Sequence, residues 1–114
     1  MMSDLIELVE ANYADISIGD ETLPDFIVQG TEKAAVLLLK QAEVYRTAAK
    51  SLRAAGKRHS ASEAAYNAKT INRIAWLLRN GRIKNAWDTV TELDRGTRRE
   101  LPSKAWEFMK RWGS

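Results

Sequence analysis

Three short stretches of the same form divide the second half of this chain into segments. Each has a leucine, then a basic residue, then a glycine: LRAAGK at 52–57, LLRNGR at 77–82 and LDRGTR at 93–98. Glycine readily adopts the left-handed backbone conformation that ends a helix, and basic side chains are favoured in a last helical turn. No segment alternates apolar and polar residues with period two, the pattern typical of a strand. The sequence therefore predicts an all-α chain.

Between these breaks, apolar residues recur every three or four positions, as on the buried face of a helix. We expect a helix of about ten residues after Ser3 and further helices near 32–55, 61–79, 82–95 and 103–112. Gly19, Pro24 and Gly30 interrupt the segment before the second of these and favour turns there. The expected fold is a compact bundle of four to five helices built from antiparallel helical hairpins.

Particular side chains mark the expected helix boundaries. Thr31 is placed to cap the helix near 32–55. SASE, residues 60–63, has the form of a capping box, in which the serine bonds a free amide and the glutamate reaches back. Gly96 is expected to end the helix near 82–95. The helices should therefore begin and end close to these residues.

Charge divides the chain into an acidic and a basic part. Residues 1–32 hold eight acidic residues and no basic one, whereas the remainder holds all 18 lysines and arginines against seven acids, a net charge of +11. A length of 114 residues fits one domain. We therefore expect a single helical domain over 1–114, with an acidic helix and loop at 1–31 and a basic helical core at 32–114. The asymmetry favours a polyanionic partner, unless the acidic segment packs on the core and neutralises it.

Basic residues of two successive helices are expected to form one surface. The first helix and the loop after it contribute Arg46, Lys50, Arg53, Lys57 and Arg58. The second helix contributes Tyr66, Lys69, Arg73 and Trp76, with Arg79 beside them. Each set follows the spacing of one helix face, and a hairpin would bring the two faces together. Cations with flat aromatic rings between them suit phosphate neutralisation and base stacking, so we expect non-catalytic binding of DNA or RNA.

The C-terminal stretch WEFMKRW supplies an alternative function. Its apolar side chains Trp106, Met109 and Trp112 either close the core or contact another protein, because aromatic residues and methionine are enriched at interfaces. In the second case the protein is a binding module, a small subunit or an inhibitor of a larger assembly. It would dock, or pair with a second copy, through this helix and the acidic N-terminus.

A third function rests on a resemblance. The stretch AAKSLRAAGKRHSASEAAYNA is similar to helical hairpins of the HEPN superfamily, and the three leucine–glycine helix ends resemble the turns of tetratricopeptide-type arrays. Arg53 and His59 have a spacing similar to the arginine–histidine pair of HEPN ribonucleases. The resemblance implies that the arginine binds RNA phosphate and the histidine assists proton transfer. We rank this below the other two functions, because His59 is expected in a loop.

Other classes of protein are not indicated. The chain has no cysteine, so disulfides and thiolate metal sites are excluded. No glycine-rich phosphate-binding loop precedes a helix, and we expect neither cofactor nor metal nor catalysis. No run of 18 apolar residues is present, so we expect no membrane span. The acidic start, MMSDLIELVE, lacks the basic region of a secretory signal, which favours a cytoplasmic protein.

Overall fold

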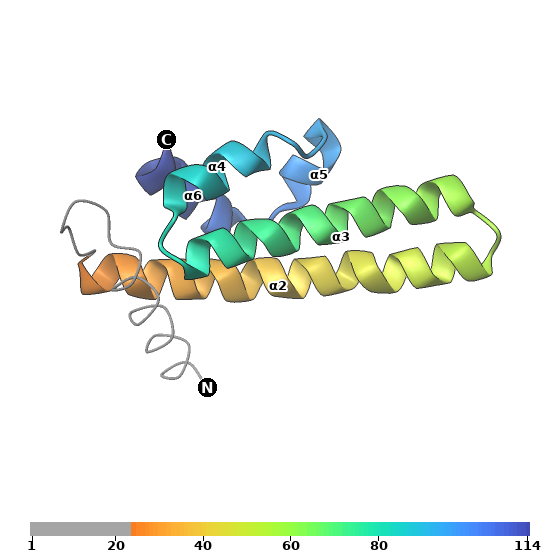
Figure 1. Ribbon diagram of the computed structural model, residues 1–114, viewed down its shortest axis with the longest axis horizontal. Helices are drawn as coiled ribbons and strands as arrows, with labels where there is room; N and C mark the ends of the chain where they lie inside the picture. The colour runs from red at the N-terminus through yellow and green to blue at the C-terminus, as the bar shows by residue number, and fades with distance from the viewer. Residues whose placement is uncertain (1–23) are drawn as a thin grey trace.

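Two long antiparallel helices form the main axis of the computed structural model, which describes residues 24–114. They are α2 (Asp25–Ala54) and α3 (Arg58–Arg79), joined by a short turn (Figure 1). Gly56 in this turn has φ +79°, and the Lys57 amide bonds to the Leu52 carbonyl at 2.9 Å. This left-handed helix end is the one that LRAAGK predicts. Gly81, with φ +75°, ends α3 in the same way, so both predicted ends are confirmed.

Three shorter helices complete the described part of the chain: α4 (Ile83–Val90), α5 (Arg95–Glu100) and α6 (Ser103–Gly113). They lie along one side of the hairpin, toward the end where α2 begins and α3 finishes (Figure 1). Residues 24–114 contain no strand. The prediction of an all-α helical bundle is therefore confirmed, and none of the described helices is long and apolar enough to cross a membrane.

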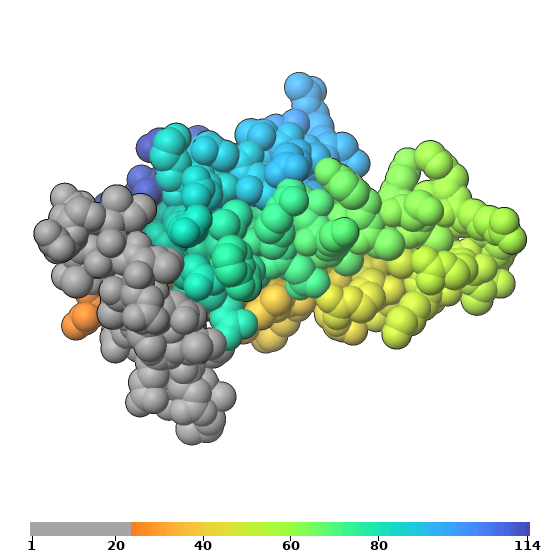
Figure 2. Space-filling model, in the orientation of Figure 1, coloured from red at the N-terminus to blue at the C-terminus, as the bar shows by residue number. Residues whose placement is uncertain are grey.

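The core changes in character along the hairpin. Beneath α4 and α6 it contains large side chains such as Leu38, Ile71, Ile74, Leu78 and Met109, all fully buried. Toward the turn, the buried residues between α2 and α3 are Ala49, Ala61, Ala64 and Ala68. Alanine fills little space and so lets two helices approach closely. The end of the hairpin near the turn is consequently a two-helix layer, and Figure 2 shows it projecting beyond the other helices.

The start of α2 differs from the prediction. The helix begins at Asp25 rather than near residue 32, so Gly30 and Thr31 lie inside it. The Thr31 hydroxyl donates to the Val28 carbonyl at 2.7 Å instead of capping the helix. Gly30 lies where α6 crosses α2, and a larger residue would not fit there. A Cβ at this position would lie 2.8 Å from Phe108 Cδ1 and closer still to Cε1. The glycine that suggested a turn is thus a site of close helix packing.

Two other predicted boundaries are also wrong. The helix α3 begins at Arg58, so Ser60 and Glu63 lie within it and form no capping box. Gly96 lies inside α5, because α4 ends earlier, at Val90. The cap at this point is Asp94, whose Oδ1 accepts a 2.6 Å hydrogen bond from the Thr97 amide. That bond stabilises the carboxylate and lowers the pKa of Asp94.

Part of the predicted organisation lies outside the described residues. The helix expected after Ser3 falls in residues 1–23, as do six of the eight acids of the acidic segment. Of the other two, Asp25 opens α2 and Glu32 is 1% exposed. Burial raises the pKa of Glu32, because desolvation disfavours the charged carboxylate.

We predict opposite effects for the same substitution at two helical glycines. Gly30→Ala should lower the free energy of unfolding by about 1–3 kcal/mol, because the new methyl group overlaps the Phe108 ring. Gly96→Ala is the matched control, since its Cβ would meet only Asp94 Oδ1 at 3.6 Å. The control should be neutral or gain up to about 1 kcal/mol from reduced backbone freedom. Urea denaturation measures both, and equal values would contradict the close packing at Gly30.

Candidate nucleic-acid interface

A shallow groove runs between α2 and α3 on the half of the hairpin nearer the turn. It has a volume of about 370 Å³ and is lined by Arg46, Ala49, Lys50, Arg53, Ala65, Ala68, Lys69 and Asn72. We call this set the basic groove. Its alanines are buried or half-buried and form the floor, whereas its basic residues are exposed. No carboxylate belongs to the lining, so cations from two helices face a common space.

Most of these charges lack a partner of opposite sign within residues 24–114. Arg46 is paired with Glu43, one turn earlier on α2, and both side chains are largely exposed. Within the described part of the chain, no ion pair involves Lys50, Arg53 or Lys69. An exposed pair such as that of Arg46 contributes little free energy and opens readily. As far as residues 24–114 are concerned, the groove therefore presents three unpaired cations and a fourth, Arg46, in a weak ion pair.

The cationic surface continues around the turn. Lys57 stands immediately before α3 and Arg58 is its first residue, and both are exposed. Beyond the groove on α3, Trp76 lies seven residues from Lys69 and four from Asn72, which places it on the same helix face. Its side chain is 58% exposed. Arg79, in the last turn of α3, is half-buried.

Two of the predicted residues lie on a different side of α3. Arg73 forms a 2.7 Å ion pair with Glu92, in the turn between α4 and α5. Tyr66 is exposed, but it lines a separate pocket whose other members include Glu63, Glu92 and Asp94. The α4–α5 turn brings Glu92 and Asp94 against α3, beside the helix's own Glu63, and the sequence did not reveal this contact. The predicted face is therefore split, and the structure brings neither Tyr66 nor Arg73 into the basic groove.

The arginine and histidine of the HEPN resemblance are not brought together. Arg53 lines the basic groove, whereas His59 lines the acid-rich pocket of Tyr66. His59 is also not in a loop, since it is the second residue of α3. Its Nε2 lies 2.8 Å from Glu63 Oε1, one turn along the helix. The two side chains therefore line separate pockets rather than one common site.

The aromatic C-terminal residues divide between core and surface. Met109 is fully buried, which is the core-closing role, the first of the two roles expected for this stretch. Trp106 is half-buried and packs edge-on against Trp87, with ring centroids 4.9 Å apart. Only Trp112 is well exposed, at 42%, and it packs edge-on against Phe26, which is 60% exposed. We call these last two residues the aromatic pair; Phe26 was not singled out from the sequence.

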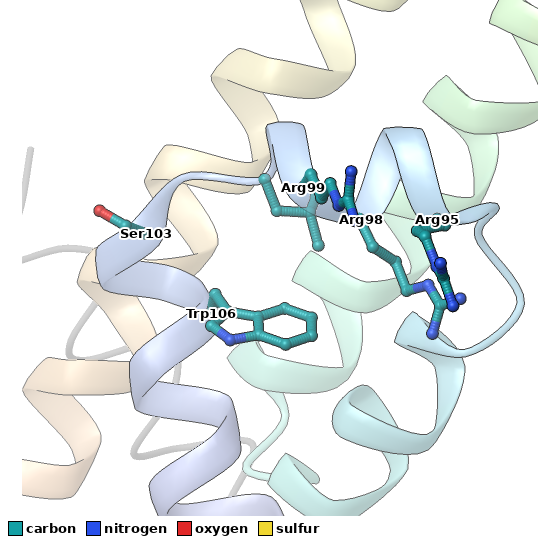
Figure 3. Close-up of a pocket in the computed structure, with 6 residues that line it drawn as sticks. Arg95, Arg98, Arg99, Ser103 and Trp106 are labelled. Atoms are coloured by element: carbon teal, nitrogen blue, oxygen red, sulfur yellow. The ribbon is translucent and has the colours of Figure 1, made fainter.

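The sequence analysis also missed a group of arginines. A pocket of about 460 Å³ is lined by Arg95, Arg98, Arg99, Leu101, Ser103 and Trp106 (Figure 3). The signal was present as RGTRRE, three arginines within five residues shortly before a tryptophan. The leucine–glycine form of residues 93–98 predicts only a helix end and says nothing of a pocket. We call this set the arginine pocket.

Comparisons with protein-family models, with curated proteins and with solved structures found no significant match. Among residues 24–114, no three histidine, aspartate or glutamate side chains are grouped so as to hold a metal ion. The charge and shape of the described surfaces are therefore the features that bear on function.

We predict that two tryptophans differ sharply in their contribution to stability. Trp76→Ala should change the free energy of unfolding by no more than about 0.5 kcal/mol, because the side chain is mostly in solvent. Trp87→Ala should cost about 3 kcal/mol, because it removes the ring packed on the core and on Trp106. Chemical denaturation measures both values. Similar losses in the two variants would mean that Trp76 is buried and has no part in a binding surface.

Proposed function

We propose that this protein binds nucleic acid, without catalysis, through the basic groove. The observation that supports the proposal is the groove itself, in which Arg46, Lys50 and Arg53 of α2 face Lys69 of α3 with no carboxylate among them. Such a surface repels itself electrostatically in the free protein. A chain of phosphates relieves that repulsion and releases its own counterions, which is the dominant source of non-specific affinity for nucleic acids.

The chemistry of the groove favours contact with the backbone rather than with base edges. Lysine acts as a point charge, and arginine forms a two-pronged contact with phosphate oxygens. Within the lining, Asn72 is the one amide side chain that could pair with a base edge. Trp76 continues the groove along α3 and offers an exposed ring for stacking with an unpaired base. We therefore propose binding with little sequence preference.

We predict a strong salt dependence that depends on the groove. The four cations of the groove and about one more from the turn, Lys57 or Arg58, give a log–log slope of roughly −4 to −5 on duplex DNA. Replacing Lys50, Arg53 and Lys69 by alanine should make that slope shallower by about 2.7 units, because three phosphate contacts are lost. Fluorescence anisotropy on a mixed-sequence duplex and on a single strand measures the slope for each protein.

A matched control separates contact from net charge. Alanine at Lys40, Lys104 and Lys110 removes the same charge from exposed positions outside the basic groove. This control should keep the wild-type slope and lose little affinity. Equal losses of affinity in both triple variants would mean that net charge, not contact in the groove, determines binding. A wild-type protein that binds neither the duplex nor the single strand at low salt would contradict the proposal.

A second candidate function is contact with another protein, and the aromatic pair is the observation that favours it. Phe26 and Trp112 hold their rings edge to face with centroids 5.6 Å apart, and 60% of Phe26 and 42% of Trp112 stay exposed. Aromatic residues of this kind are typical anchors at protein interfaces. The guanidinium of Arg111 lies 5.1 Å from the Trp112 ring centroid and provides a polar edge to the patch.

For this candidate we predict self-association through the aromatic pair. The wild-type protein should dimerise with increasing concentration in sedimentation velocity, and Phe26→Ser with Trp112→Ser should abolish the dimer because its apolar anchors are gone. Val44→Ser is the control, since Val44 is 61% exposed and lies outside the pair. A wild-type protein that stays monomeric, or a dimer that survives the double substitution, would contradict this candidate.

A further inference from the structure

The arginine pocket lies between two helices that take no part in the basic groove. The helix α5 supplies Arg95, Arg98 and Arg99, and α6 supplies Trp106. Figure 3 shows the side chains of Arg95 and Arg98 reaching toward one another, with the indole of Trp106 across the pocket from them. The Ser103 side chain points away from the indole in the same view and is assigned no contact.

The charge of this pocket is not balanced by any ion pair in the described structure. Within residues 24–114, none of the three arginines forms an ion pair. The nearest acids along the chain are already engaged, since Asp94 accepts from the Thr97 amide and Glu100 accepts from the Tyr45 hydroxyl. The pocket therefore holds three positive charges and no negative one among its lining residues.

A buried donor in the same pocket is also unsatisfied. The Nε of Arg98 is buried and has no hydrogen-bond acceptor among the described residues. A buried donor without a partner costs free energy, and native structures seldom retain one without a reason. An anion seated between the guanidinium groups would supply acceptors to this arginine and neutralise its neighbours. The unpaired Arg98 thus adds a second observation to the unbalanced charge of the pocket.

We propose that the arginine pocket binds a small nucleoside phosphate, with the phosphate groups on the arginines and the base against Trp106. Each guanidinium offers up to five N–H donors, whereas a single carboxylate has about four acceptor positions. Three arginines therefore match a diphosphate or triphosphate better than a carboxylate. The half-buried indole provides an apolar surface on which a flat ring can stack. The volume of about 460 Å³ is within the range of small-molecule sites.

Isothermal titration calorimetry of the full chain with three probes tests the proposal. ADP carries both features, pyrophosphate carries only the phosphates, and adenosine carries only the ring. We expect ADP to bind most tightly, pyrophosphate less tightly and adenosine least. Arg95→Gln with Arg98→Gln should weaken ADP binding tenfold or more, which corresponds to about 1.4 kcal/mol. The melting temperature of this double variant should stay close to wild type, because it breaks no ion pair of the described residues.

Two controls separate this site from the rest of the surface. Arg82→Gln with Arg111→Gln removes the same charge outside the pocket and should leave ADP affinity unchanged. The triple alanine variant of the basic groove should also keep ADP affinity, so a failure of the groove proposal and a failure of this one are distinguishable. Loss of ADP binding in the groove variant would assign ADP to the groove and overturn the proposal.

Three further results would overturn it. ADP and pyrophosphate that both fail to bind would show that the arginines hold no phosphate ligand. Unchanged ADP affinity after the double substitution in the pocket would place the ligand elsewhere. Pyrophosphate that binds as tightly as ADP would remove the contribution of Trp106 and with it the assignment to a nucleoside phosphate.

Discussion

The close packing of α2 against α3 through alanines is the constraint on which the other features depend. Ala49, Ala61, Ala64 and Ala68 are buried between the two helices near the turn. Because these side chains are short, the long basic residues on either side stand at the edges of a narrow layer instead of being spread around a thick core. The alanine interface thus sets both the shape of the basic groove and the distance over which its cations act together.

At the opposite end of the hairpin, the helices pack through large side chains instead of alanines. There, α4 and α6 cover the hairpin with large apolar side chains, and the close contact of Gly30 with Phe108 fixes where α6 crosses α2. This thicker region supports α5, a short helix held by the Asp94 cap. Arginines of α5 and Trp106 of α6 then enclose the arginine pocket. Two cationic surfaces therefore arise on separate helices, one on a two-helix layer and one on a multi-helix core.

The sequence predicted those features that depend on local backbone preference. The left-handed glycines Gly56 and Gly81 ended their helices as expected, because φ is positive at both. The failures involved contacts between distant residues: Gly30 accommodates Phe108, and Arg73 pairs with Glu92. Helical periodicity predicted on which face of α3 Tyr66 and Arg73 lie. It could not predict that the turn between α4 and α5 would pack beside them. The stretch RGTRRE indicated the cations of the arginine pocket, but it did not indicate the approach of α5 to α6 that places them around one space with Trp106.

The alanine-packed end of the hairpin also has a consequence for motion. Local opening is easiest where few apolar contacts must be broken. Here the two helices share small side chains, and no other helix of residues 24–114 covers them. The ends of α2 and α3 beside Gly56 should therefore separate transiently while the region under α4 and α6 stays folded. A polyanion lying across both helices would tie them together, so that binding in the basic groove would be coupled to the rigidity of the turn.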